Sequence, residues 1–299
     1  QVVNQNLDVD FVIAGNIDLS TGVIEGEKIE KAKASDSAGT VSYMRNGYGY
    51  MPIITDQGAT QYKGVRQAIA FTLDRQEFVA TVTGGYGSVV DSAYGLAMWE
   101  LAEEYEGDMV ADYLNDNLIK YTFNADSGNA ALDSDSPYKF EADGTTPWDA
   151  EKAAAEYESN KEGFSYWRYD AEGNQLIVYH EGTLENTVTD LIQTQVPDNA
   201  KLMGMQYIVN MTDFATLLTH YYNPDPNNAE APTVFNMAVG FAIPNDPYYS
   251  YHSSRIGADN NSRVNDPELD VVLETMRMAD PTDIETWVNG FVEFLVWYN

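Results

Sequence analysis

Two consecutive stretches, residues 62–73 and 74–85, carry the spacing of amphipathic helices. In the first, the residues of one helical face recur at i, i+3, i+4, i+7 and i+8: Val65, Ala68, Ile69, Thr72 and Leu73. In the second, Asp74 suits an N-cap with Glu77 three residues later, and Gly84-Gly85 offers a left-handed end. The pattern predicts two helices that meet at a corner.

Strands and helices then alternate between residues 176 and 239. Short apolar runs predict strands at 176–179, 205–209 and 234–239. Between them lie two helical stripes, and we expect Thr183 to cap the first helix and Pro197 to end it. The residues of the stripes are Val188, Leu191, Ile192 and Gln195, then Phe214, Leu217, Leu218 and Tyr221. Such alternation indicates parallel strands joined by right-handed crossovers, which is an α/β layer.

Three further helices are predicted, two of them from N-cap residues followed by proline and one from an apolar stripe. Thr146 suits an N-cap with Pro147 at the first helical position, and Asp266 with Pro267 repeats this arrangement. The last predicted helix, 284–299, keeps its apolar stripe up to the final residue. We therefore expect both ends to be cut and the chain to be a piece of a longer protein. The chain opens Gln1-Val2-Val3-Asn4, without a Met or the charged region of a signal peptide.

The charge of the chain is strongly negative. Among its 299 residues, 47 acidic side chains face 16 basic ones, for a net charge of −31, and 44% of the residues are hydrophobic. A globular protein with such a surface repels phosphate backbones and anionic lipid, so the composition excludes nucleic acid as a partner. The chain has no cysteine, which excludes disulfides and thiolate metal sites. No apolar run approaches the roughly 20 residues that a membrane span needs.

Catalytic landmarks are missing from the sequence. Three scattered histidines do not suggest a metal site, and no nucleophile elbow, P-loop or dinucleotide fingerprint follows a predicted strand. Asp133-Ser134-Asp135 lacks the glycine and glutamate of an EF-hand, which favours a solvated loop. Glu181 and Asp246 follow strands and form the least implausible carboxylate pair for a glycoside hydrolase. Residues 100–146 are acidic and turn-rich, with turns expected at 126–135.

The segment after the third predicted strand is the best candidate for binding. A backbone freed at a strand end offers N–H and C=O groups to a peptide main chain without reading its side chains. The candidate residues are Val239, Gly240, Phe241, Ala242, Ile243, Asn245 and Asp246. A purely structural exit from the sheet, rich in turn formers, explains the same residues equally well.

The helix pair also resembles a family signature. Arg66-Gln67-Ala68-Ile69, Leu73-Asp74-Arg75 and Gly84/Gly85 are similar to the signature of family 5 extracellular solute-binding proteins, the peptide- and nickel-binding subunits of ABC importers. The resemblance covers most of 8–100 and 147–299. It implies an α/β, periplasmic-binding-protein type II-like (cluster C) lobe with a mixed, partly parallel sheet flanked by helices. Residues 1–55 would end the first lobe and form the connecting strand, and 56–299 would form the second lobe, with an insertion at about 100–146.

The resemblance implies a function without catalysis or a cofactor. An extracellular, cell-surface lipoprotein or periplasmic subunit, monomeric, would capture an oligopeptide-like solute between two lobes and deliver it to membrane permease subunits. Peptide-binding members often read Ala-Asp-x-x-x-Pro, where the Asp pairs with the α-ammonium of the peptide. Anchoring on Pro247 puts Ala242 on that Ala and Ile243 on that Asp, so the charge is missing here. An interior peptide segment, a glycan or another solute therefore stays open, as does an interaction module without a small ligand, and Trp99 suits sugar faces.

Overall fold

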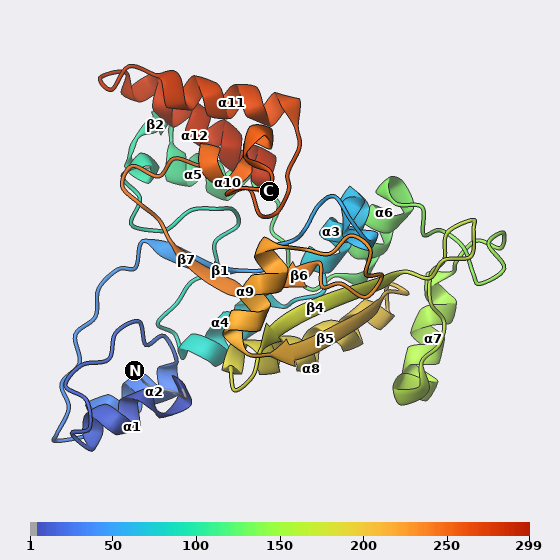
Figure 1. The fold of residues 1–299 in the computed structure, drawn as a ribbon, viewed down its shortest axis with the longest axis horizontal. Helices are drawn as coiled ribbons and strands as arrows, with labels where there is room; N and C mark the ends of the chain where they lie inside the picture. The colour runs from blue at the N-terminus through green and yellow to red at the C-terminus, as the bar shows by residue number, and fades with distance from the viewer. Residues whose placement is uncertain (1–4) are drawn as a thin grey trace.

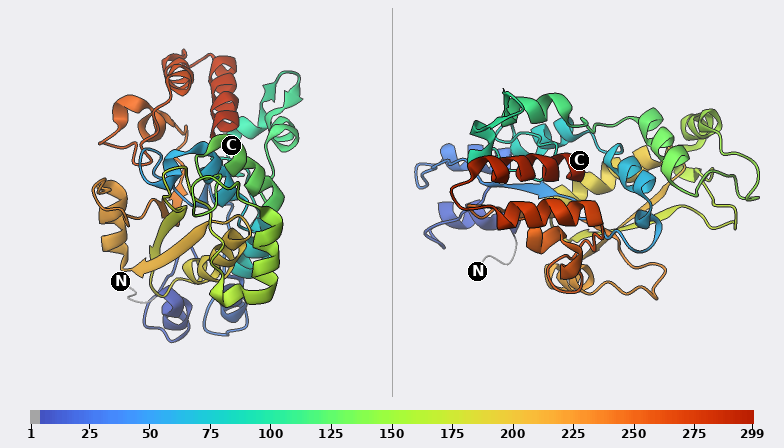
Figure 2. Two further views of the ribbon diagram at one scale, coloured as in Figure 1. Left: turned by 90° about the vertical axis from the view of Figure 1, so that its right-hand side faces the viewer. Right: turned by 90° about the horizontal axis from the view of Figure 1, so that it is seen from above.

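The computed structural model describes residues 5–299 and divides into three parts (Figure 1). The predicted lack of a signal peptide concerns residues 1–4, which lie outside the described part. A sheet layer with flanking helices forms the centre, and a helical cap built around α11 (Pro267–Met278) and α12 (Ile284–Tyr298) lies above it. The helix pair α1 (Asp8–Ile13) and α2 (Gly26–Lys33) lies at the end opposite the cap, as the left-hand view of Figure 2 shows.

The sheet layer has the predicted parallel core. Strand β4 (Ile177–Thr183) lies in the middle and pairs in parallel with β5 (Gln206–Thr212) and with β6 (Val234–Phe235). An antiparallel bridge between Ile53 and Val234 adds a segment of opposite direction. The α/β class and the mixed, partly parallel sheet are therefore confirmed.

Helices cover both faces of this sheet. Because successive strand residues point to opposite faces, Val234 and Phe235 enter different cores. The larger core lies against α3 (Lys63–Ala70) and α8 (Thr187–Lys201), and the smaller one lies under α9 (Phe214–Tyr222). The smaller core consists of Ile54, Leu217, Tyr221 and Phe235.

The predicted helix corner is confirmed. Helices α3 (Lys63–Ala70) and α4 (Arg75–Thr83) meet at Asp74, whose carboxylate accepts hydrogen bonds from the backbone N–H groups of Gln76 and Glu77. Gly84 ends α4 with φ 59°, in the left-handed region that glycine adopts without strain.

The predicted cap and end of the helix after β4 are wrong. Asn186, and not Thr183, caps α8 (Thr187–Lys201), because its side chain accepts from the N–H groups of Val188 and Thr189 while Thr183 still belongs to β4. The helix also continues through Pro197. Its buried face runs on past the proline, so packing against the sheet offsets the one backbone hydrogen bond that proline cannot donate.

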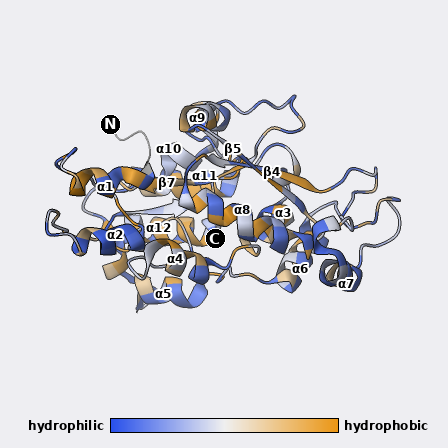
Figure 3. Ribbon diagram, turned by 90° about the horizontal axis from the view of Figure 1, so that it is seen from below, coloured by the Kyte–Doolittle hydropathy of each residue, from blue (hydrophilic) through white to orange (hydrophobic). Residues whose placement is uncertain are grey.

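A second predicted cap is displaced by three residues. Asp149, and not Thr146, caps α7 (Ala150–Asn160), since its carboxylate accepts from the N–H groups of Glu151 and Lys152. The hydroxyl of Thr146 instead donates to Asp143, 2.6 Å away, in the preceding turn. Figure 3 shows α7 and α2 as largely hydrophilic, in keeping with their positions at the edges of the molecule.

The turns expected at 126–135 are a helix. Asn124 caps α6 (Ala125–Asp135) by accepting from the N–H of Ser127. Helix α6 packs on α3 at Gly64, where a Cβ atom would lie 2.3 Å from the carbonyl oxygen of Ala131. Asp133-Ser134-Asp135 is therefore the last turn of a packed helix, and the prediction of a solvated loop is wrong.

The helical cap contains the first part of the acidic segment, from the short helical turn Trp99–Ala102 to α5. Its elements are the hairpin β2–β3 (Glu104–Tyr105 and Asp108–Met109), α5 (Val110–Asn117), α10 (Tyr248–Tyr251), α11 (Pro267–Met278) and α12 (Ile284–Tyr298). Asp266 caps α11 with Pro267 at its start, as predicted. Leu114, Leu273 and Phe291 lie in one buried core, so α5 packs with α11 and α12. Within residues 5–299, no helix combines the length and apolar character needed to cross a bilayer.

A two-stranded ribbon joins the cap to the sheet layer. Strand β1 (Gly47–Tyr50) pairs antiparallel with β7 (Met237–Gly240), with Tyr48 opposite Val239. The single strand predicted at 234–239 is therefore wrong: its first two residues pair with β4, and its last three pair with β1. Asn236 stands between the two halves, and its buried side chain is hydrogen-bonded to His180 of β4 and to Thr189 of α8.

Candidate functional site

The candidate segment leaves the ribbon and leads into α10. The backbone N–H of Phe241 donates to the carbonyl oxygen of Asn46 at 2.8 Å, and the side-chain amide of Asn46 donates to the carbonyl of Phe241. Val239 and Gly240 are paired with β1. The first three candidate residues are therefore fixed by the ribbon.

The backbone becomes free immediately afterwards. In the described part of the chain, the main-chain groups of Ala242, Ile243 and Asn245 form no hydrogen bond with protein atoms. Ala242 and Pro244 are exposed, and Ile243 is 74% exposed. This segment can offer its N–H and C=O groups to an extended ligand, which is the arrangement that main-chain recognition requires.

Asp246 is already paired. Its carboxylate lies 2.6 Å from Nη1 of Arg277 and also accepts from the N–H of Tyr248. The guanidinium of Arg277 lies over the rings of Tyr248 and Tyr249, 4.6 Å from each ring centre. Arg277 therefore neutralises Asp246 and fastens this end of the segment to α11.

A small hollow lies beside the free segment. Residues 242–245 form one wall, and Asn46, Trp99 and Glu100 contribute to the others. Glu100 is only 1% exposed, and the indole N–H of Trp287 donates to its Oε1 at 3.2 Å. Burial raises the pKa of the Glu100 carboxyl above its ordinary value, although hydrogen bonds from its own backbone N–H and from Trp287 act in the opposite direction.

Glu100 was missed by the sequence reasoning. It belongs to the acidic segment 100–146, where a glutamate is expected on the surface. The signal that could have identified it is local: Met98, Trp99 and Leu101 surround it, so a short apolar turn carries a single carboxyl.

The predicted carboxylate pair is not built as a catalytic pair. Glu181 lies 2.8 Å from Nδ1 of His220, and Asp246 is paired with Arg277, so each carboxylate has a separate partner. His180 is fully buried between the hydroxyl of Tyr207 at 2.7 Å and the amide of Asn236 at 3.0 Å. Burial lowers the pKa of His180 to about 4, so the ring is neutral at pH 7 and serves the sheet core.

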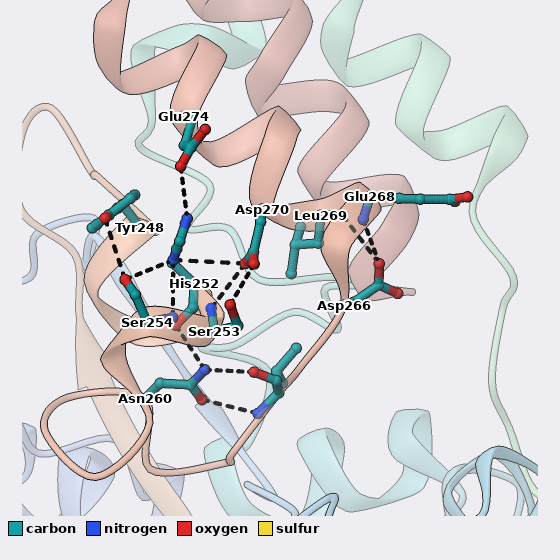
Figure 4. Close-up of polar contacts among 11 residues, drawn as sticks. Tyr248, His252, Ser253, Ser254, Asn260, Asp266, Glu268, Leu269, Asp270 and Glu274 are labelled. Atoms are coloured by element: carbon teal, nitrogen blue, oxygen red, sulfur yellow. Dashed lines mark hydrogen bonds and ion pairs between the residues drawn. The ribbon is translucent and has the colours of Figure 1, made fainter.

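His252, the third histidine, connects the segment that follows α10 with helix α11 (Figure 4). Its Nδ1 accepts from the N–H of Ser254, and its Nε2 lies 3.2 Å from Glu274. The carboxylate of Asp270 accepts from the N–H of Ser253 at 2.8 Å. Nδ1 of His252 caps the short helical turn 253–255, and the hydroxyl of Ser254 lies within hydrogen-bond distance of the same nitrogen. The cluster therefore serves to hold this turn against α11. Among residues 5–299, no group of three or more His, Asp or Glu side chains is placed to hold a metal ion.

Comparison with known proteins identifies the fold. No protein-family model and no curated protein sequence matches the chain. Solved structures do match. The oligopeptide-binding protein AppA from Bacillus subtilis, in complex with a nonapeptide, superposes with a TM-score of 0.75 at 17% identity, over 99% of this chain and 51% of that one.

Two further solved structures extend the comparison. NikZ from Campylobacter jejuni, in complex with Ni(L-His), gives a TM-score of 0.69 at 14% identity over 100% of this chain and 52% of that one. A periplasmic oligopeptide-binding protein from Thermotoga maritima with bound mannohexaose gives 0.67 at 13% identity, over 98% and 50%. The chain therefore has the fold of the oligopeptide- and nickel-binding proteins of ABC importers and spans about half the length of these structures. The fold implied by the family 5 resemblance is confirmed.

Proposed function

We propose that this chain is part of a solute-binding subunit of an ABC importer, which captures an oligopeptide-like solute between two lobes and delivers it to a membrane permease. The observation that carries the proposal is the combination of this fold with an unpaired backbone at residues 242–245. The neighbouring structures are binding proteins, which supports a role without catalysis.

The proposed ligand-binding residues are Val239, Gly240, Phe241, Ala242, Ile243, Asn245 and Asp246. The ribbon holds the first three, Arg277 holds the last, and the free groups between them pair with the main chain of an extended ligand. Such pairing gives affinity for many sequences, because it uses atoms that all peptides share.

Two lobes would enclose the solute. Residues 1–55 belong to the first lobe and its connecting strand, 56–299 to the second, and about 100–146 form an insertion relative to the family. Hinge closure of the lobes would trap the ligand. Since a closed pocket buries most of the ligand surface, one lobe alone supplies one wall and binds weakly, with dissociation constants on the order of 1 mM.

The same proposal implies a cellular location and a set of partners. The subunit would act as a monomer outside the cell, as a periplasmic protein or as a surface lipoprotein, and its macromolecular partners would be permease subunits and not nucleic acid. An oligosaccharide is the alternative solute, favoured by Trp99 beside the free segment and by the mannohexaose in one structural neighbour.

Backbone hydrogen exchange tests the proposal. Tetra-alanine at millimolar concentration should slow exchange at Ala242, Ile243 and Asn245, because these N–H groups gain acceptors. Exchange in α7, far from the segment (Figure 1), is the internal control and should not change. Protection by mannohexaose but not by the peptide would favour the alternative, and no protection by either would contradict the proposed site.

A further inference from the structure

We propose that the carboxyl group of Glu100 binds a primary ammonium group of the ligand in the hollow beneath residues 242–245. This inference rests on the proposed function and names the chemical group that the site selects.

Glu100 is a buried carboxyl without a counter-ion. It is 1% exposed, and within residues 5–299 no lysine, arginine or histidine forms an ion pair with it. Its two donors, the indole of Trp287 and its own backbone N–H, are both neutral. A buried carboxylate normally has an opposite charge or loses its own, so this position has capacity for a cation.

A second residue that lines the hollow has an acceptor with unused capacity. The side-chain oxygen of Asn46 is buried, and within residues 5–299 no donor bonds to it. An ammonium group carries three donors and no acceptor, so a carboxylate and an amide oxygen are both suitable partners for it. At these two oxygen atoms an anion would meet only acceptors.

The hollow is narrow in the conformation described. The space among its lining atoms, part of which is open solvent, is about 140 Å³, and it has no room for a water molecule. One of its walls is residues 242–245; within residues 5–299 the backbone of Ala242, Ile243 and Asn245 has no hydrogen-bond partner, and three of the four residues are exposed. Displacing this wall therefore breaks few contacts, and a ligand paired with the wall arrives next to the Glu100 carboxyl.

This placement also accounts for the missing aspartate. Ile243 stands where the resemblance implies the Asp that holds a peptide ammonium, and Asp246 is committed to Arg277. Glu100 brings a carboxyl to the same segment from a distant part of the chain. The ammonium can be a peptide N-terminus or a lysine side chain, and the experiment separates the two.

The indole N–H of Trp287 reports directly on Glu100. The full chain, labelled with ¹⁵N at its five tryptophans, is titrated with tetra-alanine, with N-acetyl-tetra-alanine and with N-acetyl-Ala-Lys-Ala-Ala, and Trp287→Phe assigns the signal. We expect tetra-alanine to shift the Trp287 signal and to bind at least about tenfold more tightly than its acetylated form. If the ammonium group is instead that of a lysine side chain, N-acetyl-Ala-Lys-Ala-Ala should bind more tightly than tetra-alanine.

Two variants complete the test. Glu100→Gln should abolish the preference for the ammonium form, whereas Glu100→Asp, which keeps the charge, should retain part of it. Glu104→Gln, in exposed β2, is the matched control and should behave as the parent chain. Equal binding of free and acetylated peptides, unchanged by Glu100→Gln, would overturn the inference and leave the proposed function standing. If none of the peptides shifts the Trp287 signal, the inference also fails, and hydrogen exchange at 242–245 then decides whether peptide binding survives.

Discussion

The sheet layer and the helical cap each bury one charged side chain completely, and they treat it in opposite ways. Arg168 and Glu100 are both 1% exposed. Arg168 donates to Asp133 at 2.6 Å, to Asn129 at 3.1 Å and to the carbonyls of Met203 and Tyr138, and its guanidinium lies 3.9 Å from the ring centre of Trp148. In the part of the chain that the structure describes, Glu100 has two neutral donors and no oppositely charged partner.

The difference fits a structural role for the Arg168 charge and the proposed ligand-binding role for the Glu100 charge. A buried ion that is hydrogen-bonded on several sides joins the elements that supply its partners, and Arg168 ties α6 to the β4–β5 side of the sheet. A buried ion without a partner costs stability, and proteins keep such groups mainly where a ligand supplies the partner. The comparison therefore supports a stabilising role for Arg168 in the sheet layer and fits the proposed recognition role of Glu100 at the edge of the cap.

The largest effect is expected from Arg168→Met. Removing the guanidinium leaves Asn129 and two buried carbonyl groups without their donor, so the free energy of unfolding should fall by about 3–5 kcal/mol. Urea denaturation measures the change. Lys120→Met removes a half-exposed ion pair with Asp91 and should cost far less. Equal losses of unfolding free energy in Arg168→Met and Lys120→Met would contradict the special stabilising role given to Arg168.

Gly64→Ala tests the hydrogen bonds of Arg168 indirectly, by moving the helix that supplies two of its partners. The added Cβ would lie 2.3 Å from the carbonyl oxygen of Ala131 and would push α6, which carries Asn129 and Asp133, away from α3. We expect a loss of about 1–3 kcal/mol in urea denaturation. Gly39→Ala is the control, because nothing lies within 4 Å of its added Cβ. A loss no larger than that of the control would show that α6 is not held tightly.

Glu100→Gln should change stability in the opposite direction. Because the pKa of Glu100 is raised by folding, its contribution to stability is fully present below the ordinary value of 4.5 and is lost as the pH rises through the folded pKa. The variant should therefore unfold at a higher temperature than the parent at pH 7, and the difference should vanish at pH 3. A variant less stable at pH 7 would show that the carboxylate already has a partner.

Arg277→Gln should have the smallest effect on stability. The variant frees Asp246 and loosens residues 242–249, but the core of the cap contains none of these side chains except Tyr248 at its edge. We expect faster hydrogen exchange at 246–249 and a nearly unchanged melting temperature. Thr275→Val on the exposed side of α11 is the control. Unchanged exchange would show that Arg277 does not fasten the segment.

The sequence was sufficient where one face of an element is buried along its whole length. The stripe of α3, the cap at Asp74 and the start of α11 follow from local spacing, and the parallel sheet follows from the order of strands and helices. The resemblance added the correct fold to that local pattern.

The sequence was insufficient where tertiary contacts override local preference. Helix α6 looks like a polar loop, but one buried Leu132 and the contact with Gly64 stabilise it. Pro197 looks like a helix end, but the sheet holds the helix on both sides of it. Glu100 looks like one surface acid among many, because its burial depends on Trp287, which lies 187 residues away. The positions of the predicted ligand-binding residues stay a prediction.

Asn236 has a mechanical consequence. The ribbon and the sheet layer share one continuous backbone, and only this residue stands between β6 and β7. On the β7 side, the chain therefore passes from the sheet layer to the ribbon through one residue and not through a loop. The direction in which β7 leaves the sheet is set at a single amide, which is bonded to His180 and Thr189.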